Sequence, residues 1–231
     1  MNKSPRPGEV QVLYEDDAVV VLNKPPGLPS VPIHKTSRGP SALSVLAAAL
    51  AQERRRPFVV HRIDRFTSGV LLFAKTERDR EALIQQFLEH TPSRQYLAVV
   101  RGNLDEQKAT LVHYFQREGF FQKQRPENDP GATRAEMRYT VERKLRDATL
   151  VRVELVTGLQ NQIRVQFSAI GHPVVGDRKY HPREAKETHI DRVALHAARL
   201  EFIHPRTNRR VSVECDPPAD FKELVKSLKA T

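Results

Sequence analysis

The chain has 231 residues and a formal charge of +10, because 38 Lys and Arg residues outnumber 28 Asp and Glu residues. Its one cysteine, Cys215, excludes a disulfide framework and a zinc site built on cysteines. The longest nearly apolar run, 42–51, is about half as long as the ~20 residues of a membrane helix. The first residues also lack the apolar centre of a secretory signal. We therefore expect a cytoplasmic protein with no membrane segment.

The charge also bears on the kind of partner. A surplus of positive charge on a protein of this size favours a polyanion such as nucleic acid. A basic pI that serves only solubility is the alternative. The chain has no Trp, 10 Phe and 5 Tyr, so a broad surface for stacking bases is not expected.

The first elements can be placed from apolar runs and turn residues. Residues 1–12 are polar, and we expect a flexible arm there. The run 18–22 is wholly apolar and predicts a buried strand, which ends at the stiff turn 23–27. Ser41 is a predicted N-cap for a helix whose apolar residues recur at helical spacing up to Leu50.

Two short apolar runs come next, at 58–60 and 69–74, and we expect them to be strands on either side of the charged segment 61–68. Thr76 begins a capping-box pattern that predicts a helix. The run 95–101 is a further predicted strand.

Residues 103–132 are polar and contain two prolines, so we expect a loop excursion or insertion there. Alternating apolar and polar residues over 135–142 and 151–155 predict half-buried strands that pair in antiparallel fashion. Asn161 is a predicted N-cap for the following helix, and Gly171 is placed to end it.

The last part of the chain begins with a polar loop over 174–192. A hairpin is predicted from 198–203 and 210–214, and a final helix follows Pro218. Strands outnumber helices, which predicts an α+β fold with a mixed, largely antiparallel β-sheet and flanking helices. We expect residues 1–231 to form a single catalytic domain.

Several common catalytic motifs are absent from the sequence. It has no glycine-rich loop for a nucleotide phosphate, no G-x-S-x-G and no H-E-x-x-H. His172, His181 and His189 could form a metal site, but two of them precede proline and suit turns better. We expect no metal.

The segment from His61 to Gly69 is a dense polar island between two apolar runs. Asp64 lies between Arg62 and Arg65, and nearby positive charge favours the ionised form of a carboxylate. Such a group can act as a nucleophile or a general base. A solvated loop of salt bridges is an equally good interpretation of these residues alone.

A second polar segment, 157–164, leads into a helix N-terminus and ends at Arg164. Helix N-termini favour anions such as phosphate. Ordinary capping by Asn161 with an exposed Arg164 is the simpler interpretation.

The segment 61–75 resembles the signature of the RluA family of RNA pseudouridine synthases, and the rest of the chain agrees with it. Further motifs resemble those of the family and follow in the same order, covering about residues 12–222. They are Tyr14-Glu15-Asp16-Asp17, Asn23-Lys24-Pro25-Pro26-Gly27-Leu28, Tyr96 with Gly102, Thr157-Gly158 with Gln162-Ile163-Arg164, Gly171-His172-Pro173, Gly176-Asp177, and Leu195-His196-Ala197 with His204-Pro205.

The resemblance implies an enzyme that converts uridine in RNA to pseudouridine without a cofactor or metal. It implies that Asp64 is the catalytic carboxylate, which attacks a flipped nucleoside at ribose C1′ or at uracil C6. Tyr96 matches the tyrosine that lies against the uracil and helps to remove a proton. Arg164 matches the arginine that pairs with the catalytic Asp and keeps it ionised, and Arg62 matches the residue that fills the gap left by the flipped base.

The expected partner is rRNA or tRNA, bound by a monomer. No separate RNA-binding domain is expected in front of the catalytic one, so RNA contacts would come from this domain, helped by the basic tract 54–56 and by segment 117–134. The residues expected to contact RNA are His61, Arg62, Arg65, Thr67, Gln162, Arg54 and Arg55.

The chain departs from the family pattern at three positions. Leu159 and Asn161 stand where the family usually has Arg and His, and Phe66 stands where it often has Asp. We still expect activity, because Asp64 is retained. Two other functions stay open: a non-catalytic RNA chaperone, and a carboxylate N-glycosidase, which needs a second acid that the sequence does not show.

Overall fold

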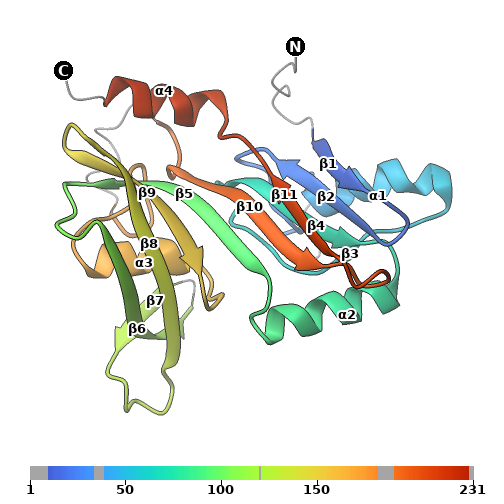
Figure 1. The fold of residues 1–231 in the computed structure, drawn as a ribbon, viewed down its shortest axis with the longest axis horizontal. Helices are drawn as coiled ribbons and strands as arrows, with labels where there is room; N and C mark the ends of the chain where they lie inside the picture. Colours follow the sequence, from blue (N-terminus) through green and yellow to red (C-terminus); the bar gives the residue numbers. More distant parts are fainter. Residues whose placement is uncertain (1–9, 34–38, 120, 182–189, 229–231) are drawn as a thin grey trace. The chain divides into compact units, whose positions relative to one another are not determined.

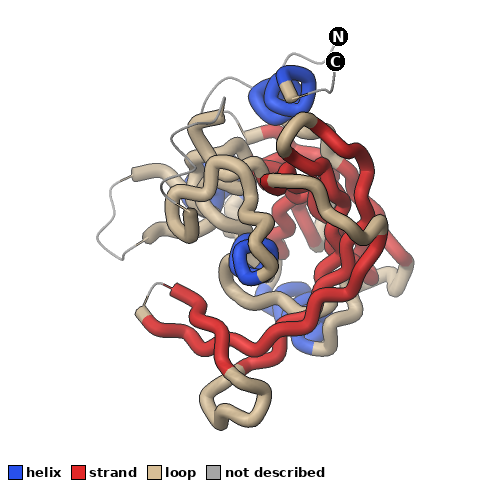
Figure 2. Tube along the Cα trace, turned by 90° about the vertical axis from the view of Figure 1, so that its left-hand side faces the viewer, coloured by secondary structure: helices blue, strands red, loops and turns tan. Residues whose placement is uncertain are grey.

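The computed structural model describes residues 10–33, 39–119, 121–181 and 190–228, and the chain divides into two compact units. Unit 1 contains Met1–Arg94 and His196–Pro218, and unit 2 contains Gln95–Leu195 and Ala219–Thr231. No composition shift in the sequence marks these boundaries. Strands make up much of the described chain (Figure 2).

Unit 1 is built on a mixed sheet (Figure 1). Its neighbouring strands β1–β2, β2–β4 and β10–β11 pair in antiparallel fashion, β3 joins β4 antiparallel, and β10 and β4 are parallel. These pairings confirm the predicted strands at 18–22, 58–60 and 69–74 and the predicted hairpin. The strands are β1 (Gln11–Glu15), β2 (Val19–Lys24), β3 (Phe58–Val59), β4 (Ser68–Ala74), β10 (Leu195–Ile203) and β11 (Arg210–Glu214).

Helices pack on both faces of this sheet. Helix α1 (Ala42–Leu50), followed by the short 3-10 helix η1 (Ala51–Glu53), packs against side chains such as Leu71 and Phe73 of β4. Helix α2 (Glu77–Leu88) packs on the other face of the sheet, against side chains of β4 such as Leu72. Burial on both faces explains why β2 and β4 are continuous apolar runs.

Unit 2 contains an antiparallel sheet in the order β5-β9-β8-β6-β7. Helix α3 (Gln162–Ala169) packs on it through Val165, which contacts Phe115 and Ala135. Helix α4 (Ala219–Ser227) closes the described chain. The strands are β5 (Ser93–Arg101), β6 (Lys108–Glu118), β7 (Phe121–Arg125), β8 (Thr133–Leu145) and β9 (Ala148–Leu155).

The α+β class with a mixed, largely antiparallel sheet is therefore confirmed. The prediction of an irregular excursion over 103–132 is wrong, because β6 and β7 lie within it. Residues 11 and 12 of the predicted arm belong to β1, and residues 1–9 lie outside the described residues. None of the described helices is long and apolar enough to cross a membrane.

Candidate active site

Asp64 lies in unit 1, on the segment between β3 and β4. The backbone N–H of Thr67 donates to the carbonyl oxygen of Asp64 over 3.1 Å, which closes a tight turn. The turn therefore begins at Asp64, which is half-buried, and has Arg65 and Phe66 as its central residues.

A buried lysine holds this turn in place. The Lys24 side chain is fully buried, and its ammonium donates to the carbonyl oxygens of Pro25 (3.0 Å), Leu28 (2.8 Å) and Arg65 (3.1 Å). The Arg65 carbonyl also accepts the Gly27 N–H at 2.9 Å, and the Arg65 Nε donates to the Gly27 oxygen at 2.8 Å. The turn that ends β2 is thus bonded to the residue that follows Asp64.

The segment is also fixed on each side of this turn. The Ser30 hydroxyl donates to the Ile63 carbonyl at 2.7 Å and accepts the Ile63 N–H at 3.2 Å. Gly69 has a φ of +109°, and a Cβ there would lie 2.1 Å from the Ala197 carbonyl oxygen. Only glycine permits this approach of β10 to β4. Asp64 therefore sits on a segment whose neighbours are anchored on both sides.

His61 supports the sheet. Its Nε2 accepts the backbone N–H of Leu72 over 3.1 Å, between the parts of β4 that pair with β10 and with β3. The ring stacks on Phe87, with centroids 4.7 Å apart. Burial, helped by the positive charge of Arg94, lowers the pKa of His61 to about 3. These contacts give the ring a structural role, and its contact with RNA stays a prediction.

The other residues of unit 1 expected to contact RNA differ in exposure. Arg62 and Arg65 are exposed on the Asp64 segment, and Arg54 and Arg55 are exposed after η1, where Arg55 pairs with an aspartate at 3.0 Å. Thr67 is only 1% exposed, so its side chain is enclosed within the unit and not presented on the surface. These four exposed arginines are therefore better placed than Thr67 to contact RNA.

Tyr96 and Arg164 belong to unit 2. Tyr96 lies on β5 opposite Val153 of β9 and is 9% exposed. The Tyr96 side chain is therefore almost entirely buried.

Arg164, on α3, is held by a carboxylate that the sequence analysis did not select. Its Nε donates to Asp177 Oδ2 at 2.8 Å and its Nη2 to Asp177 Oδ1 at 2.7 Å, while Nη1 donates to Asn161 Oδ1 at 2.8 Å. Burial alone would raise the pKa of Asp177, but the bonds from Arg164 hold that pKa below its ordinary value. The only signal in the sequence was the Gly176-Asp177 motif, 13 residues further along the chain.

The N-terminus of α3 differs from the prediction. Asn161 has a left-handed backbone (φ 59°) and makes no capping bond with its side chain, which instead accepts from Arg164. Gln162, the first residue of the helix, binds the segment before it: its Oε1 accepts the Leu159 N–H at 2.9 Å and also accepts from the Thr157 hydroxyl. The Gln162 amide nitrogen donates to two further partners. All its hydrogen-bonding positions are used inside unit 2, which argues against the predicted RNA contact.

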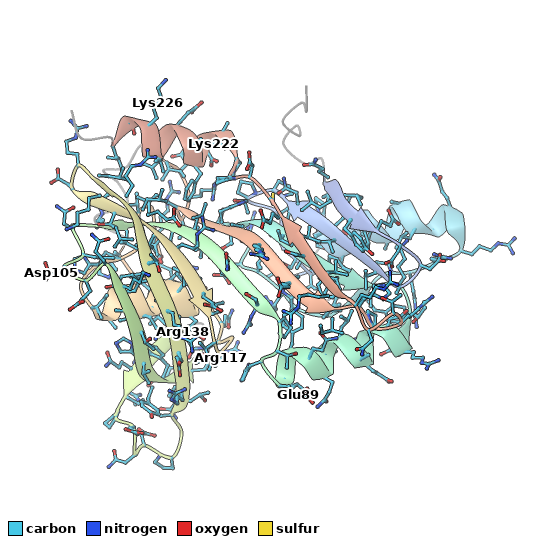
Figure 3. The ribbon with its side chains drawn as sticks, viewed as in Figure 1. Glu89, Asp105, Arg117, Arg138, Lys222 and Lys226 are labelled. Carbon is cyan, nitrogen blue, oxygen red and sulfur yellow. The ribbon has the colours of Figure 1, made fainter. Side chains whose placement is uncertain are left out.

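Several basic side chains of unit 2 are exposed, and some of them are ion-paired. Arg117 and Arg138 lie exposed on the sheet, and Lys222 and Lys226 on α4 (Figure 3). Lys123, Arg125 and Arg134 form ion pairs with neighbouring glutamates, and Arg138 also lies 4.0 Å from Glu136. Among the described residues, no cluster of three or more His, Cys, Asp or Glu side chains is arranged to hold a metal ion.

Comparison with known proteins shows the family to which the chain belongs. Residues 18–169 match the family model of RNA pseudouridylate synthases. The chain belongs to this family. Asp64, Tyr96 and Arg164 all lie in the matched part. Because the family members are pseudouridine synthases, the protein is an RNA pseudouridine synthase, an isomerase.

Individual relatives agree with the family model. The chain is 36% identical to YlyB of Bacillus subtilis, named an uncharacterized RNA pseudouridine synthase, over 96% of this chain and 74% of that protein. It is 32% identical to ribosomal large subunit pseudouridine synthase D of Zymomonas mobilis, over 98% and 75%. The solved structure of human RNA pseudouridylate synthase domain containing 4 shares the fold, with a TM-score of 0.77, 20% identity and coverage of 94% and 92%.

Proposed function

We propose that this pseudouridine synthase uses Asp64 as the nucleophile that attacks a uridine flipped out of its RNA. The observation that carries the proposal is the anchoring of the Asp64 turn, because Lys24 and Gly27 bond to the residue directly after the aspartate. A nucleophile must be held in a defined position before it reacts, and a rigid support supplies that position.

The reaction changes connectivity without changing composition. The bond from ribose C1′ to uracil N1 breaks, the base rotates, and a bond from C1′ to C5 forms. The C5 proton is lost and a proton is taken up at N1, so no electrons enter or leave and no redox group is required. Asp64 attacks either C1′ or C6, and its covalent adduct divides this exchange into smaller steps.

The other proposed roles belong to Tyr96, Arg164 and Arg62. Tyr96 lies against the uracil and assists removal of the C5 proton, and Arg164 binds the catalytic carboxylate. Arg62, which is exposed two residues before Asp64, fills the space left by the flipped base. Flipping costs a few kcal/mol of stacking, and least in loops that are already unpaired. An inserted side chain offsets part of this cost.

We propose rRNA as the first substrate to test and tRNA as the second. The name of the Zymomonas relative, which refers to the large ribosomal subunit, supports this order. The positive charge supports a polyanion in either case. A single chain carries every proposed residue, so we propose that it acts as a monomer, in the cytoplasm.

The proposal is tested with RNA labelled with tritium at uracil C5. Formation of pseudouridine releases this tritium to water, and we expect release from ribosomal RNA. Release of free uracil would indicate hydrolysis of the glycosidic bond and contradict the proposed isomerisation. Failure to release tritium from both rRNA and tRNA would contradict the proposed substrates.

A further inference from the structure

Phe66 is an exposed aromatic residue at the centre of the Asp64 turn. Its side chain is 46% exposed, whereas Thr67, Ser68 and Ile63 on the same segment are buried. Isolated apolar residues on a surface are common and need no special explanation. The position of Phe66 is different, because it lies two residues after the proposed nucleophile on a segment fixed by hydrogen bonds.

The backbone beneath this ring is already ordered. The carbonyl oxygen of Arg65 accepts bonds from Lys24 and Gly27, and the carbonyl of Asp64 accepts the N–H of Thr67. A phenylalanine on such a support has only two side-chain torsions left to fix when it binds. Rigid aromatic side chains of this kind provide contact area at a low cost in conformational entropy.

The charge around the ring suits RNA. The Arg65 guanidinium lies 5.3 Å from the centre of the Phe66 ring, and its Nε is bound to the Gly27 oxygen, which orients the group. Arg62 is also exposed on this segment. A partly exposed aromatic ring with an oriented guanidinium over it matches a nucleobase and its phosphates, since every base has a face that can stack.

We propose that Phe66 stacks on an unpaired nucleobase adjacent to the target uridine, while Arg65 contacts a neighbouring phosphate. This inference rests on the proposed function, since it takes Asp64 to mark the place of the target uridine. Stacking of the neighbouring base would favour RNA that is unpaired around that uridine. Phe66 would thereby select single-stranded substrates over duplexes.

Photo-crosslinking tests the contact directly. The probe is a transcript of large-subunit ribosomal RNA in which part of the uridine is replaced by 5-iodouridine, which crosslinks to stacked aromatic side chains on irradiation. After digestion, mass spectrometry should find a nucleotide attached to Phe66. Adducts on other peptides with none on Phe66, or no adduct at all, would overturn the proposal.

Asp64→Asn separates this inference from the proposed function. An adduct on Phe66 in this variant, with tritium release abolished, is the result expected if both hold. Tritium release by the wild type without an adduct would overturn the stacking alone. An adduct without any tritium release from the wild type would leave the stacking intact and contradict the proposed function.

Binding measurements give a second readout. Phe66→Ala and Phe66→Leu should weaken binding of a 20-nucleotide single-stranded RNA by roughly 5- to 150-fold, the range for loss of one stacked base. Phe66→Tyr should stay within about twofold of the wild type, because it keeps an aromatic face. Affinity for the same strand in a perfect duplex should hardly change. Equal binding by Phe66→Leu and the wild type, or an equal loss on the duplex, would contradict stacking.

Discussion

The guanidinium of Arg164 and the carboxylate of Asp177 form a two-bond ion pair inside unit 2, with N–O distances of 2.8 and 2.7 Å. Asp177 is 1% exposed, and its Oδ1 also accepts the backbone N–H groups of Lys179 and Tyr180. The carboxylate is therefore fixed by its own loop before it binds Arg164. A planar guanidinium held by two parallel bonds has a defined orientation.

Asp177→Asn tests whether this orientation matters for the reaction. The variant loses the charge and one of the two parallel bonds, so we expect kcat to fall by about 10- to 100-fold with a smaller change in KM. The free energy of unfolding should fall by about 3 kcal/mol, because the change breaks a buried ion pair. Steady-state tritium release and urea unfolding provide the two measurements.

Asp191→Asn is the matched control for this variant. Asp191 belongs to the same unit and pairs with Arg178 at 3.6 Å, but both side chains are largely exposed. Exposed pairs contribute little to stability, so this variant should resemble the wild type in both measurements. An unchanged kcat in a folded Asp177→Asn variant would show that Asp177 does not position Arg164 for catalysis.

Lys24→Met tests the support of the Asp64 turn. Methionine is similar in length to lysine but removes one hydrogen-bond donor from each of three carbonyl oxygens, so unit 1 should lose at least about 2 kcal/mol. Because one of these carbonyls belongs to Arg65, kcat should also fall at temperatures where the variant is fully folded. Circular dichroism and tritium release measure the two effects.

Lys75→Met provides the comparison, since Lys75 is also a buried lysine of unit 1 and pairs with Glu15 at 2.5 Å. Loss of this pair should lower stability without lowering kcat, because Lys75 makes no bond to the Asp64 turn in the described structure. If the two variants lost activity equally at equal folded fraction, Lys24 would have no special role in the site.

His61 makes the stability of unit 1 depend on pH. Its folded-state pKa of about 3 is below the ordinary value of 6.5, so the unfolded chain binds the proton first as the pH falls. The stabilisation is fully present above about pH 6.5 and is lost as the pH falls toward 3. In that window the wild type should lose up to about 1.4 kcal/mol per pH unit from this group.

The measurement compares urea unfolding of the wild type and His61→Gln between pH 7.5 and pH 4. Glutamine does not titrate and retains an oxygen that can accept the Leu72 N–H. The wild type should therefore lose stability more steeply than the variant, while other acidic groups affect both equally. Parallel curves would mean that His61 has the same pKa in the folded and the unfolded chain and would contradict its lowered folded-state pKa.

Much of the fold follows from local patterns in the sequence. The apolar runs of β2 and β4 predict buried strands because helices cover both faces, and Ser41 and Thr76 cap α1 and α2 as their patterns indicate. Strands β6 and β7 were missed because their side chains are largely polar and half-exposed. Their strand structure comes from the pairing of β6 with β8 and of β7 with β6, which local sequence does not encode.

The sequence predicts a site residue only where the groups that mark its function lie close to it in the chain. Asp64 stands out between two arginines within one short segment, and that signal is local. The roles of Asp177 and Lys24 could not be predicted in this way, because they depend on hydrogen bonds to residues 13 and 41 positions away in the chain. Asn161 has the side chain of an N-cap, but its left-handed backbone turns that side chain to Arg164.

Asp64→Asn, compared with the wild type, tests the central role of this carboxylate most directly. Asparagine keeps the size and shape of the side chain but is not a nucleophile, and Asp17→Asn in the same unit, with a side chain 78% exposed, is the matched control. With C5-tritiated ribosomal RNA, we expect Asp64→Asn to bind the RNA but release no tritium, while Asp17→Asn releases it as the wild type does. Tritium release by Asp64→Asn at the rate of the wild type would show that another group carries out the attack.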